Sequence, residues 1–292
     1  MNPELNVFAF ISGLYGTALN NAVTQNVQAG LQFSHGWLRA AAAVWILATA
    51  IMALMQNLGT ARLIQRLLRV LIISALITSP DLYTRFVVQP VMTGIPNQIA
   101  RTFGGPAAQT MPDQFASIYS TIGNMASQLR TEASGILYIA DRFAIWFAEL
   151  CCKFLLVPEF VLYVVLQLFT ALVVIAGTLV LIFYMFDATK SFAEAWIGTV
   201  VGCLVTTALM SITMQMVLQM ITTYIQKIGA LPVSSHGFGI NVTEGAEVLI
   251  NIAVMFIVGF FLMVMAFILG FAIGRSAGIN ASAVLQRFAR PV

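Results

Sequence analysis

Three long runs of apolar residues dominate the second half of the chain. They cover residues 160–186, 197–225 and 248–273, and none of them contains a charged side chain. A helix needs about 20 apolar residues to cross a hydrocarbon core about 30 Å thick. The pattern therefore predicts three transmembrane helices, each with some tilt or extension beyond the membrane.

Two further spans are predicted in the first half of the chain. Residues 40–58 form an apolar run with Trp37 and Arg39 at one end, and tryptophan is favoured at the headgroup layer. The run at 70–79 is too short by itself. It crosses the membrane only if Leu67 and Leu68 join it while Arg69 reaches out to water, or if the helix continues past Pro80. We therefore expect an all-α polytopic membrane protein with about five transmembrane helices.

Residues 136–157 are long enough to cross the membrane, but they carry three charges. Arg142, Glu149 and Lys153 fall within about 40° of one another on a helical wheel. Charges at mid-membrane are costly, and a helix lying in the interface avoids that cost by turning this charged stripe toward water. We predict an interfacial helix and keep a crossing helix as the alternative.

The distribution of basic residues predicts the orientation. With five spans, short loops and the tail on one side hold seven basic residues, whereas the short pieces on the other side hold only Arg39 and Lys227. The seven are Arg62, Arg66, Arg69, Lys190, Arg275, Arg287 and Arg290. Because basic residues are retained in the cytoplasm, we expect a periplasmic N-terminus and a cytoplasmic C-terminus.

These patterns divide the chain into five regions. Five of the nine prolines fall at 80–112, which predicts irregular chain there, followed by a polar helix at 113–129. The expected regions are a periplasmic amphipathic segment rich in Asn and Gln (1–36), transmembrane helices 1–2 (37–88), a periplasmic central loop with the interfacial helix at about 136–157 (89–158), transmembrane helices 3–5 (159–275) and a cytoplasmic tail (276–292).

Composition agrees with a membrane protein and excludes several functions. The chain is 60% hydrophobic and 9% charged, whereas soluble domains carry about 25% charged residues. A formal charge of +3 without a run of Lys or Arg argues against a nucleic-acid-binding surface of the usual kind. Cys151, Cys152 and Cys203 have no metal-ligand spacing. We find no catalytic set or phosphate loop, so we predict a protein that is not an enzyme and has no cofactor or metal.

The apolar runs do carry signals for helix packing. Gly198 and Gly202 are four residues apart, and Gly270, Gly274 and Gly278 form a tandem version of the same spacing. Small residues at this spacing let two helix backbones approach closely in lipid. The contact lies either within the chain or between subunits. A methionine stripe in the run 197–225 could likewise meet irregular partners or simply pack in the core or against lipid: Met210, Met214, Met216 and Met220.

The predicted turn between the first two long runs has a recognisable sequence. It reads Phe-Tyr-Met-Phe-Asp-Ala-Thr-Lys from 183 to 190 and opens the next run with Trp-Ile-Gly at 196–198. Trp196 suits the headgroup layer, and Asp187, after Phe186, can cap the turn or pair with Lys190. This motif resembles the TrbL family, which holds the sixth protein of the VirB set, the polytopic inner-membrane component of bacterial type IV secretion systems. The resemblance is strongest over about 160–225.

The resemblance implies a non-enzymatic component of a secretion or conjugation machine in the bacterial inner membrane. It implies a ring-like homo-oligomer that supports a stalk or pilus, with minor and major pilin-like subunits, other inner-membrane and core secretion components, membrane lipid and a transient protein or DNA substrate as partners. The region 80–135, with the N-terminal segment, is then the expected contact for the minor pilin.

Two other functions stay open at this stage. A small-solute transporter or channel would use Arg142, Glu149 and Lys153 to line a lumen. A membrane anchor would instead hold a partner enzyme encoded elsewhere.

Overall fold

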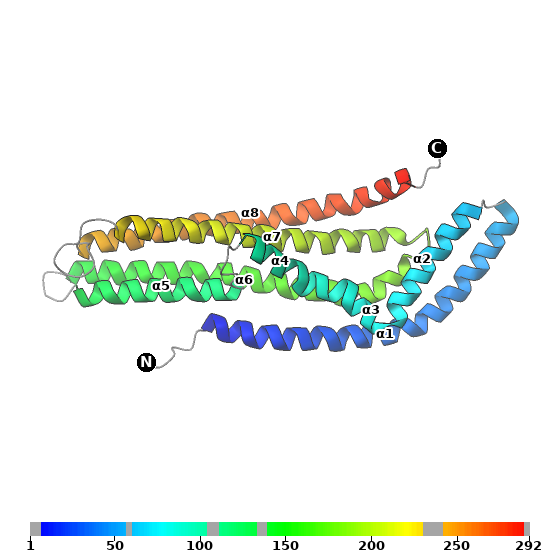
Figure 1. Cartoon of the computed structure of the whole chain (residues 1–292), viewed down its shortest axis with the longest axis horizontal. Coiled ribbons are helices and arrows are strands. Elements are labelled where there is room, and N and C mark those ends of the chain that lie inside the picture. The colour runs from blue at the N-terminus through cyan, green and yellow to red at the C-terminus, as the bar shows by residue number, and fades with distance from the viewer. Residues whose placement is uncertain (1–6, 57–59, 104–110, 133–138, 230–241, 289–292) are drawn as a thin grey trace. The chain divides into compact units, whose positions relative to one another are not determined.

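The described part of the chain is almost entirely helical (Figure 1). The computed structural model describes residues 7–56, 60–103, 111–132, 139–229 and 242–288. Its elements are α1 (Val7–Gln56), α2 (Thr60–Thr78), α3 (Pro80–Tyr83), the π-helices η1 (Thr84–Val88) and η2 (Pro90–Gly94), α4 (Ile95–Phe103), α5 (Met111–Glu132), α6 (Ile139–Phe183), α7 (Lys190–Gly229) and α8 (Val242–Phe288). The expected all-α class is confirmed.

Three helices carry the three long apolar runs. The segments long and apolar enough to cross a membrane are Ile139–Phe183, Lys190–Ile221 and Glu247–Gly274, within the residues described. The full helices α6, α7 and α8 have 45, 40 and 47 residues. At about 1.5 Å per residue each is about 60–70 Å long, roughly twice the hydrocarbon core. The expected extension beyond the membrane is therefore large.

Helix α6 joins two regions that the sequence pattern separated. The boundary expected at 158/159, between an interfacial helix and the third span, falls inside one continuous helix with Pro158 in its interior. Proline removes one backbone hydrogen bond and usually kinks or ends a helix. Here Leu156 and Phe160, on either side of it, are buried, and this packing holds the helix together across the proline.

The helix does not run straight past Pro80. Arg66–Thr78 and Pro80–Gly94 meet at an angle of 100°, because proline disfavours the helical conformation in the residue before it. Ser79 accordingly adopts φ −114° and ψ 101°. The predicted span that includes residues 70–79 is therefore sharply broken. The described residues hold three candidate spans, or four if this bent pair crosses as one. The predicted span at 40–58 lies on α1 and runs into residues 57–59, outside the described part, so it stays a prediction.

The proline-rich stretch is more regular than expected. Irregular chain was predicted over 80–112, but residues 80–103 are helical. Two turns are widened, with the Gln89 N–H donating to the Thr84 carbonyl and the Ile95 N–H to the Pro90 carbonyl. Such π-type turns let a helix continue where proline leaves a carbonyl without its usual donor.

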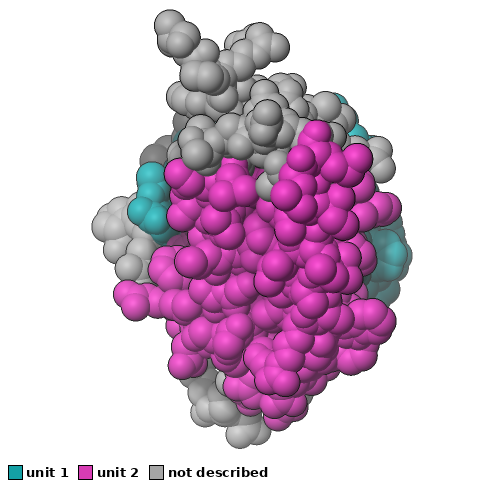
Figure 2. All heavy atoms as spheres, turned by 90° about the vertical axis from the view of Figure 1, so that its right-hand side faces the viewer, with its two compact units in different colours: residues 1–13, 97–165, 206–269 teal, residues 14–96, 166–205, 270–292 magenta. Residues whose placement is uncertain are grey.

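The chain divides into two compact units, coloured separately in Figure 2. Unit 1 holds residues 1–13, 97–165 and 206–269, and unit 2 holds residues 14–96, 166–205 and 270–292. In unit 1, α5 buries one face, including Ile118, Ile122 and Leu129, and Phe115 meets Phe160 of α6 edge to face at 5.4 Å.

Unit 2 has its core where α1 meets α6. Val23, Val27 and Leu31 of α1 pack with Tyr83 and with the Ala171–Val174 part of α6. A second cluster joins α1, α2 and the end of α6 through Leu38, Ile73, Ile77 and Met185. Residues 14–38 of the predicted periplasmic segment and first span thus form one helix docked on α6.

Candidate functional site: the turn between α6 and α7

The turn after α6 is closed by its own residues. The Thr189 hydroxyl donates to the Phe183 carbonyl at 2.8 Å, and the Thr189 N–H donates to the Phe186 carbonyl at 3.1 Å. The last carbonyls of a helix have no partner within the helix, so such bonds stabilise its end. The threonine of the motif therefore fixes the exit from α6.

Asp187 of this turn binds two arginines of α2. Its carboxylate lies 2.9 Å from Arg66 and 2.8 Å from Arg69. The Arg69 guanidinium also lies over the Tyr184 ring, 5.3 Å from its centre. We call Asp187, Arg66 and Arg69 the Asp187 clamp. The sequence pattern predicted that Asp187 caps the turn or pairs with Lys190, whereas the structure shows ion pairs with two arginines of α2.

The arginine partners could have been suspected from their spacing. Arg66 and Arg69 are three residues apart, so they share a face of α2, and the basic-residue pattern put them on the same side of the membrane as the turn. Their side chains are 24% and 29% exposed and that of Asp187 is 49% exposed. Beside the clamp is a hollow of about 320 Å³, lined by Trp45, Ala48, Thr49, Arg66, Met185, Phe186, Asp187 and Ala188.

Trp196 is partly buried, and its indole N–H is bonded to α6. Its indole Nε1 donates to the Val173 carbonyl at 2.7 Å, and the Tyr83 hydroxyl donates to the next carbonyl, Val174, at 2.6 Å. Gly177, one turn further along α6, leaves room for both rings, because a Cβ there would overlap Trp196 and Tyr83. The tryptophan of the motif thus holds α7 against α6.

The glycine pairs meet within the chain. A Cβ on Gly274 would overlap the Gly202 backbone, and one on Gly202 would lie 3.3 Å from the Gly274 Cα. The Gly198 carbonyl lies 2.7 Å from the Gly274 Cβ position, and the Gly270 carbonyl 3.7 Å from that of Gly202. The structure therefore shows the intrachain alternative for these four. Gly278 lies on α8, but its surroundings are outside the described side chains.

The charged stripe of unit 1 is split by α5. Glu149 is buried and accepts hydrogen bonds from Arg130 of α5 and, at 2.6 Å, from Lys153. Lys153 Nζ also lies 4.6 Å from the centre of the Tyr119 ring. Only Arg142 of the stripe is exposed. The three residues therefore do not present one continuous charged face, either to water or to a lumen within this chain.

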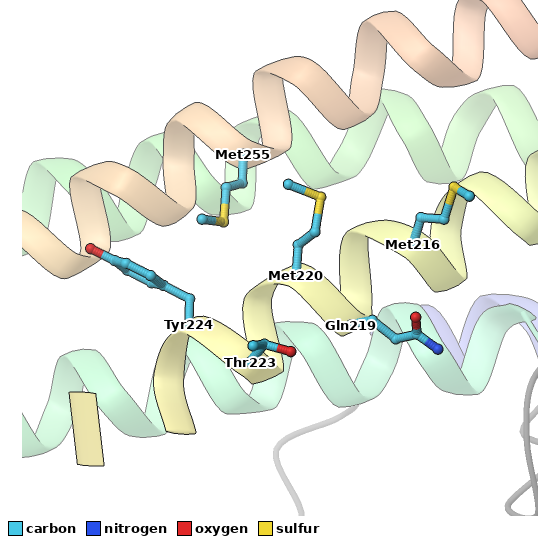
Figure 3. Close-up of a pocket in the computed structure, with 6 residues that line it drawn as sticks. All are labelled: Met216, Gln219, Met220, Thr223, Tyr224 and Met255. Carbon is cyan, nitrogen blue, oxygen red and sulfur yellow. The ribbon is translucent and has the colours of Figure 1, made fainter. Parts of the chain in front are cut away.

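The methionine stripe of α7 also divides. Met210 and Met214 are fully buried, whereas Met216 and Met220 are 58% and 52% exposed. The exposed pair lines an apolar groove of about 550 Å³ with Gln219, Thr223, Tyr224 and Met255 (Figure 3). Asn251 of α8 donates to the Tyr224 hydroxyl at 2.7 Å. Only one half of the stripe is thus available to a partner or to lipid.

No set of metal ligands accompanies these features in the described residues. No group of three or more His, Cys, Asp or Glu side chains there could hold a metal ion. The Asp187 clamp, the Trp196 contact and the glycine crossing are all contacts between helices. The site is therefore organised to position helices around the turn.

Comparison with known proteins agrees with this picture. Residues 40–267 match the family described as TrbL/VirB6 plasmid conjugal transfer protein. Protein VirB6 of Agrobacterium fabrum is 27% identical over 165 residues, and Protein VirB6 of Agrobacterium tumefaciens is 26% identical over the same length. Each match covers 56% of this chain and 56% of the relative. The family match covers most of the chain and includes the turn and its arginine partners, so the chain belongs to the TrbL/VirB6 family of inner-membrane type IV secretion and conjugation components.

Proposed function

We propose that this chain is a non-enzymatic inner-membrane component of a type IV secretion machine that oligomerises and supports stalk or pilus assembly and substrate passage. The observation that carries the proposal is the family match over residues 40–267, which contains the Asp187 clamp. The clamp and the Trp196 contact join α2, α6 and α7 around a short turn. Such a fixed turn suits a part that keeps its shape inside a larger assembly.

The orientation is part of the proposal. Arg66 and Arg69 neutralise Asp187 at the turn end of α6, and the excess of basic residues at that end favours the cytoplasm. We propose a cytoplasmic turn at 184–189, a cytoplasmic C-terminus, and a periplasmic loop between α7 and α8. The five-span count is retained here as a proposal.

The proposed contact for the minor pilin is the outer region at 80–135 together with the N-terminal segment. The structure supports a surface experiment in preference to a deletion, because α5 is part of the packing of unit 1 through Phe115 and Arg130. Substitution of exposed residues of α5, such as Gln128 and Thr131, leaves these contacts in place.

Complementation tests the proposed function. A strain lacking its own copy of the gene, but holding the rest of the secretion genes, receives the full chain or an empty vector. We expect the chain to restore plasmid or effector transfer and to purify with pilin-like and core secretion subunits. Normal transfer in the strain with the empty vector would contradict the proposal. Co-purification only with a redox enzyme or a kinase would favour a membrane anchor, and a solute-flux activity would favour a transporter.

A further inference from the structure

Helix α1 carries a face of polar, uncharged side chains although it packs beside an apolar part of α6. Between residues 20 and 32 it holds six amide side chains and no charge: Asn20, Asn21, Gln25, Asn26, Gln28 and Gln32. Four of these are spaced so that they fall within about 60° of one another at 100° per residue. We call Asn21, Gln25, Gln28 and Gln32 the amide stripe.

The amide stripe lies opposite the buried edge of α1. Val23, Val27 and Leu31 form that edge, against α6, while all four amides of the stripe are exposed. Two of the off-stripe polar side chains are bonded within α1, since Asn26 donates to the Ala22 carbonyl and Thr24 to the Asn20 carbonyl, both at 2.8 Å. For the stripe itself, no hydrogen bond is recorded among the residues that the structure describes.

The neighbouring part of α6 sets the depth of the stripe. α1 contacts Ala171 and Val174 through its core, and Ser34 donates to the Thr178 carbonyl at 2.8 Å. A side chain on Gly30 would collide with Thr178, so the two helices approach closely there. Residues 171–178 lie in the middle of the charge-free run 160–186. The amide stripe therefore runs beside the part of unit 2 that the hydrocarbon core must cover.

Exposed amides at this depth need water. Lipid offers no hydrogen-bond partner, so an uncompensated row of carboxamides facing it is strongly unfavourable. A helix from another chain would have to offer a matched polar partner to each of the four amides, and a side-chain hydrogen bond between helices in lipid contributes only modestly to their association. Past the end of the stripe, on another face of α1, are the exposed rings of Phe33 and Trp37, 6.3 Å apart, which suit lipid.

We propose that the amide stripe of α1 lines a water-filled passage through the membrane. Its wall would be polar but uncharged over Asn21–Gln32, so it would hold neither a polyanion nor a basic polypeptide by charge. This inference goes beyond the proposed function, because it concerns what the membrane-embedded surface contacts. It replaces the predicted crossing at 40–58 by a crossing of α1 that includes residues 21–32, and it leaves only the residues before the stripe for the periplasm. It requires insertion of the chain but no active secretion, so the two claims fail separately.

Cysteine accessibility tests the passage. Asn21, Gln25, Gln28 and Gln32 are changed singly to Cys in the full chain, in native membranes, and treated with a charged, membrane-impermeant thiol reagent. Thiols react as thiolates, which form in water and not in lipid, so we expect labelling at least about tenfold faster than at Leu172→Cys. Leu172 is the matched control, since it lies on α6 at the same depth and is 64% exposed.

Two further variants complete the test. Val27→Cys, on the buried edge, is expected to stay unreactive, and the parent chain with its three native cysteines gives the blank. Absence of labelling at all four stripe positions would overturn the proposal. So would equally fast labelling at Leu172, which would place the segment in bulk water, or spontaneous disulfide-linked dimers at the stripe, which would make it an interface between copies.

Discussion

At the scale of single residues, the contacts between helices depend on glycines, which have no side chain at the point of contact. Gly177 and Gly274 each face a group with which an added Cβ would collide, and a Cβ on Gly202 would lie 3.3 Å from the Gly274 Cα. Their neighbours are backbone atoms or aromatic rings fixed by hydrogen bonds, which cannot give way easily. Close packing of this kind is how helices associate in lipid, where no hydrophobic force drives them together.

We expect Gly274→Ala to lower the free energy of unfolding by roughly 1–3 kcal/mol, as overpacking does in a filled core. The measurement is thermal or denaturant unfolding of the chain in detergent. Gly36→Ala is the matched control, because it is also helical but its Cβ would meet nothing within 4 Å. That change is expected to be neutral or slightly stabilising. Equal effects of the two changes on the free energy of unfolding would contradict a close crossing of α7 and α8 at Gly274.

At the scale of elements, the apolar runs were predictable and the partners of the polar residues were not. Length and lack of charge predict α7, α8 and the second half of α6, because lipid tolerates little else over about 20 residues. They do not predict that α6 continues back to Ile139 through charged residues. The ion pairs of Glu149 and Asp187 join residues up to 121 positions apart. Helical spacing puts Arg66 and Arg69 on one face, but it does not say which distant segment meets that face. The wheel grouped Glu149 and Lys153 correctly with Arg142, but it could not show that α5 covers two of the three.

The same limit applies to Pro80. The sequence allowed either a helix that ended before it or one that continued, because proline constrains the local backbone but not the direction of the next helix. The bend of 100° combines the break that Pro80 causes at Ser79 with packing in unit 2, where Tyr83 is buried and its hydroxyl donates to the Val174 carbonyl.

Replacing Pro80 by Ala should loosen the bend. Alanine restores an N–H and relieves Ser79, so conformations with a straighter helix become accessible. Spin labels at the exposed positions Ile72 and Phe86 would report this as a broader and longer distance distribution. A distribution identical to that of the parent would mean that the packing of Tyr83 alone dictates the angle.

The docking of α5 on α6 should depend on Glu149. Glu149→Gln leaves Arg130 and Lys153 without a counter-charge in a partly buried place, so we expect a loss of roughly 1–3 kcal/mol, below the value for a fully buried pair because both cations are partly exposed. Faster cleavage by trypsin at Arg130 would report local opening of α5. Arg142→Gln, on the same helix but exposed, is the control and should leave the cleavage rate unchanged.

At the scale of the whole molecule, lipid determines which parts of the chain lie in the membrane and which lie outside it. Each long helix must place its charge-free part in the hydrocarbon core and its charged ends outside it. Reporter fusions test the resulting orientation. A reporter that is active only in the cytoplasm is expected to be active when fused at Ala188 or after Val292. A reporter that is active only in the periplasm is expected to be active when fused near residue 235. The reverse assignment at Ala188 would contradict the proposed orientation.

In the proposed function, this chain works in a secretion machine through a turn held by the Asp187 clamp. The most direct measurement of that function is plasmid transfer by a deletion strain that carries D187R, the pair R66D and R69D, or all three substitutions together, with each protein shown by immunoblot to be in the membrane. Reversing one side sets like charges together, so transfer should fall by about tenfold or more, whereas the triple variant restores opposite charges and should recover most of it. Full transfer by D187R, or no recovery in a triple variant that reaches the membrane, would contradict the account.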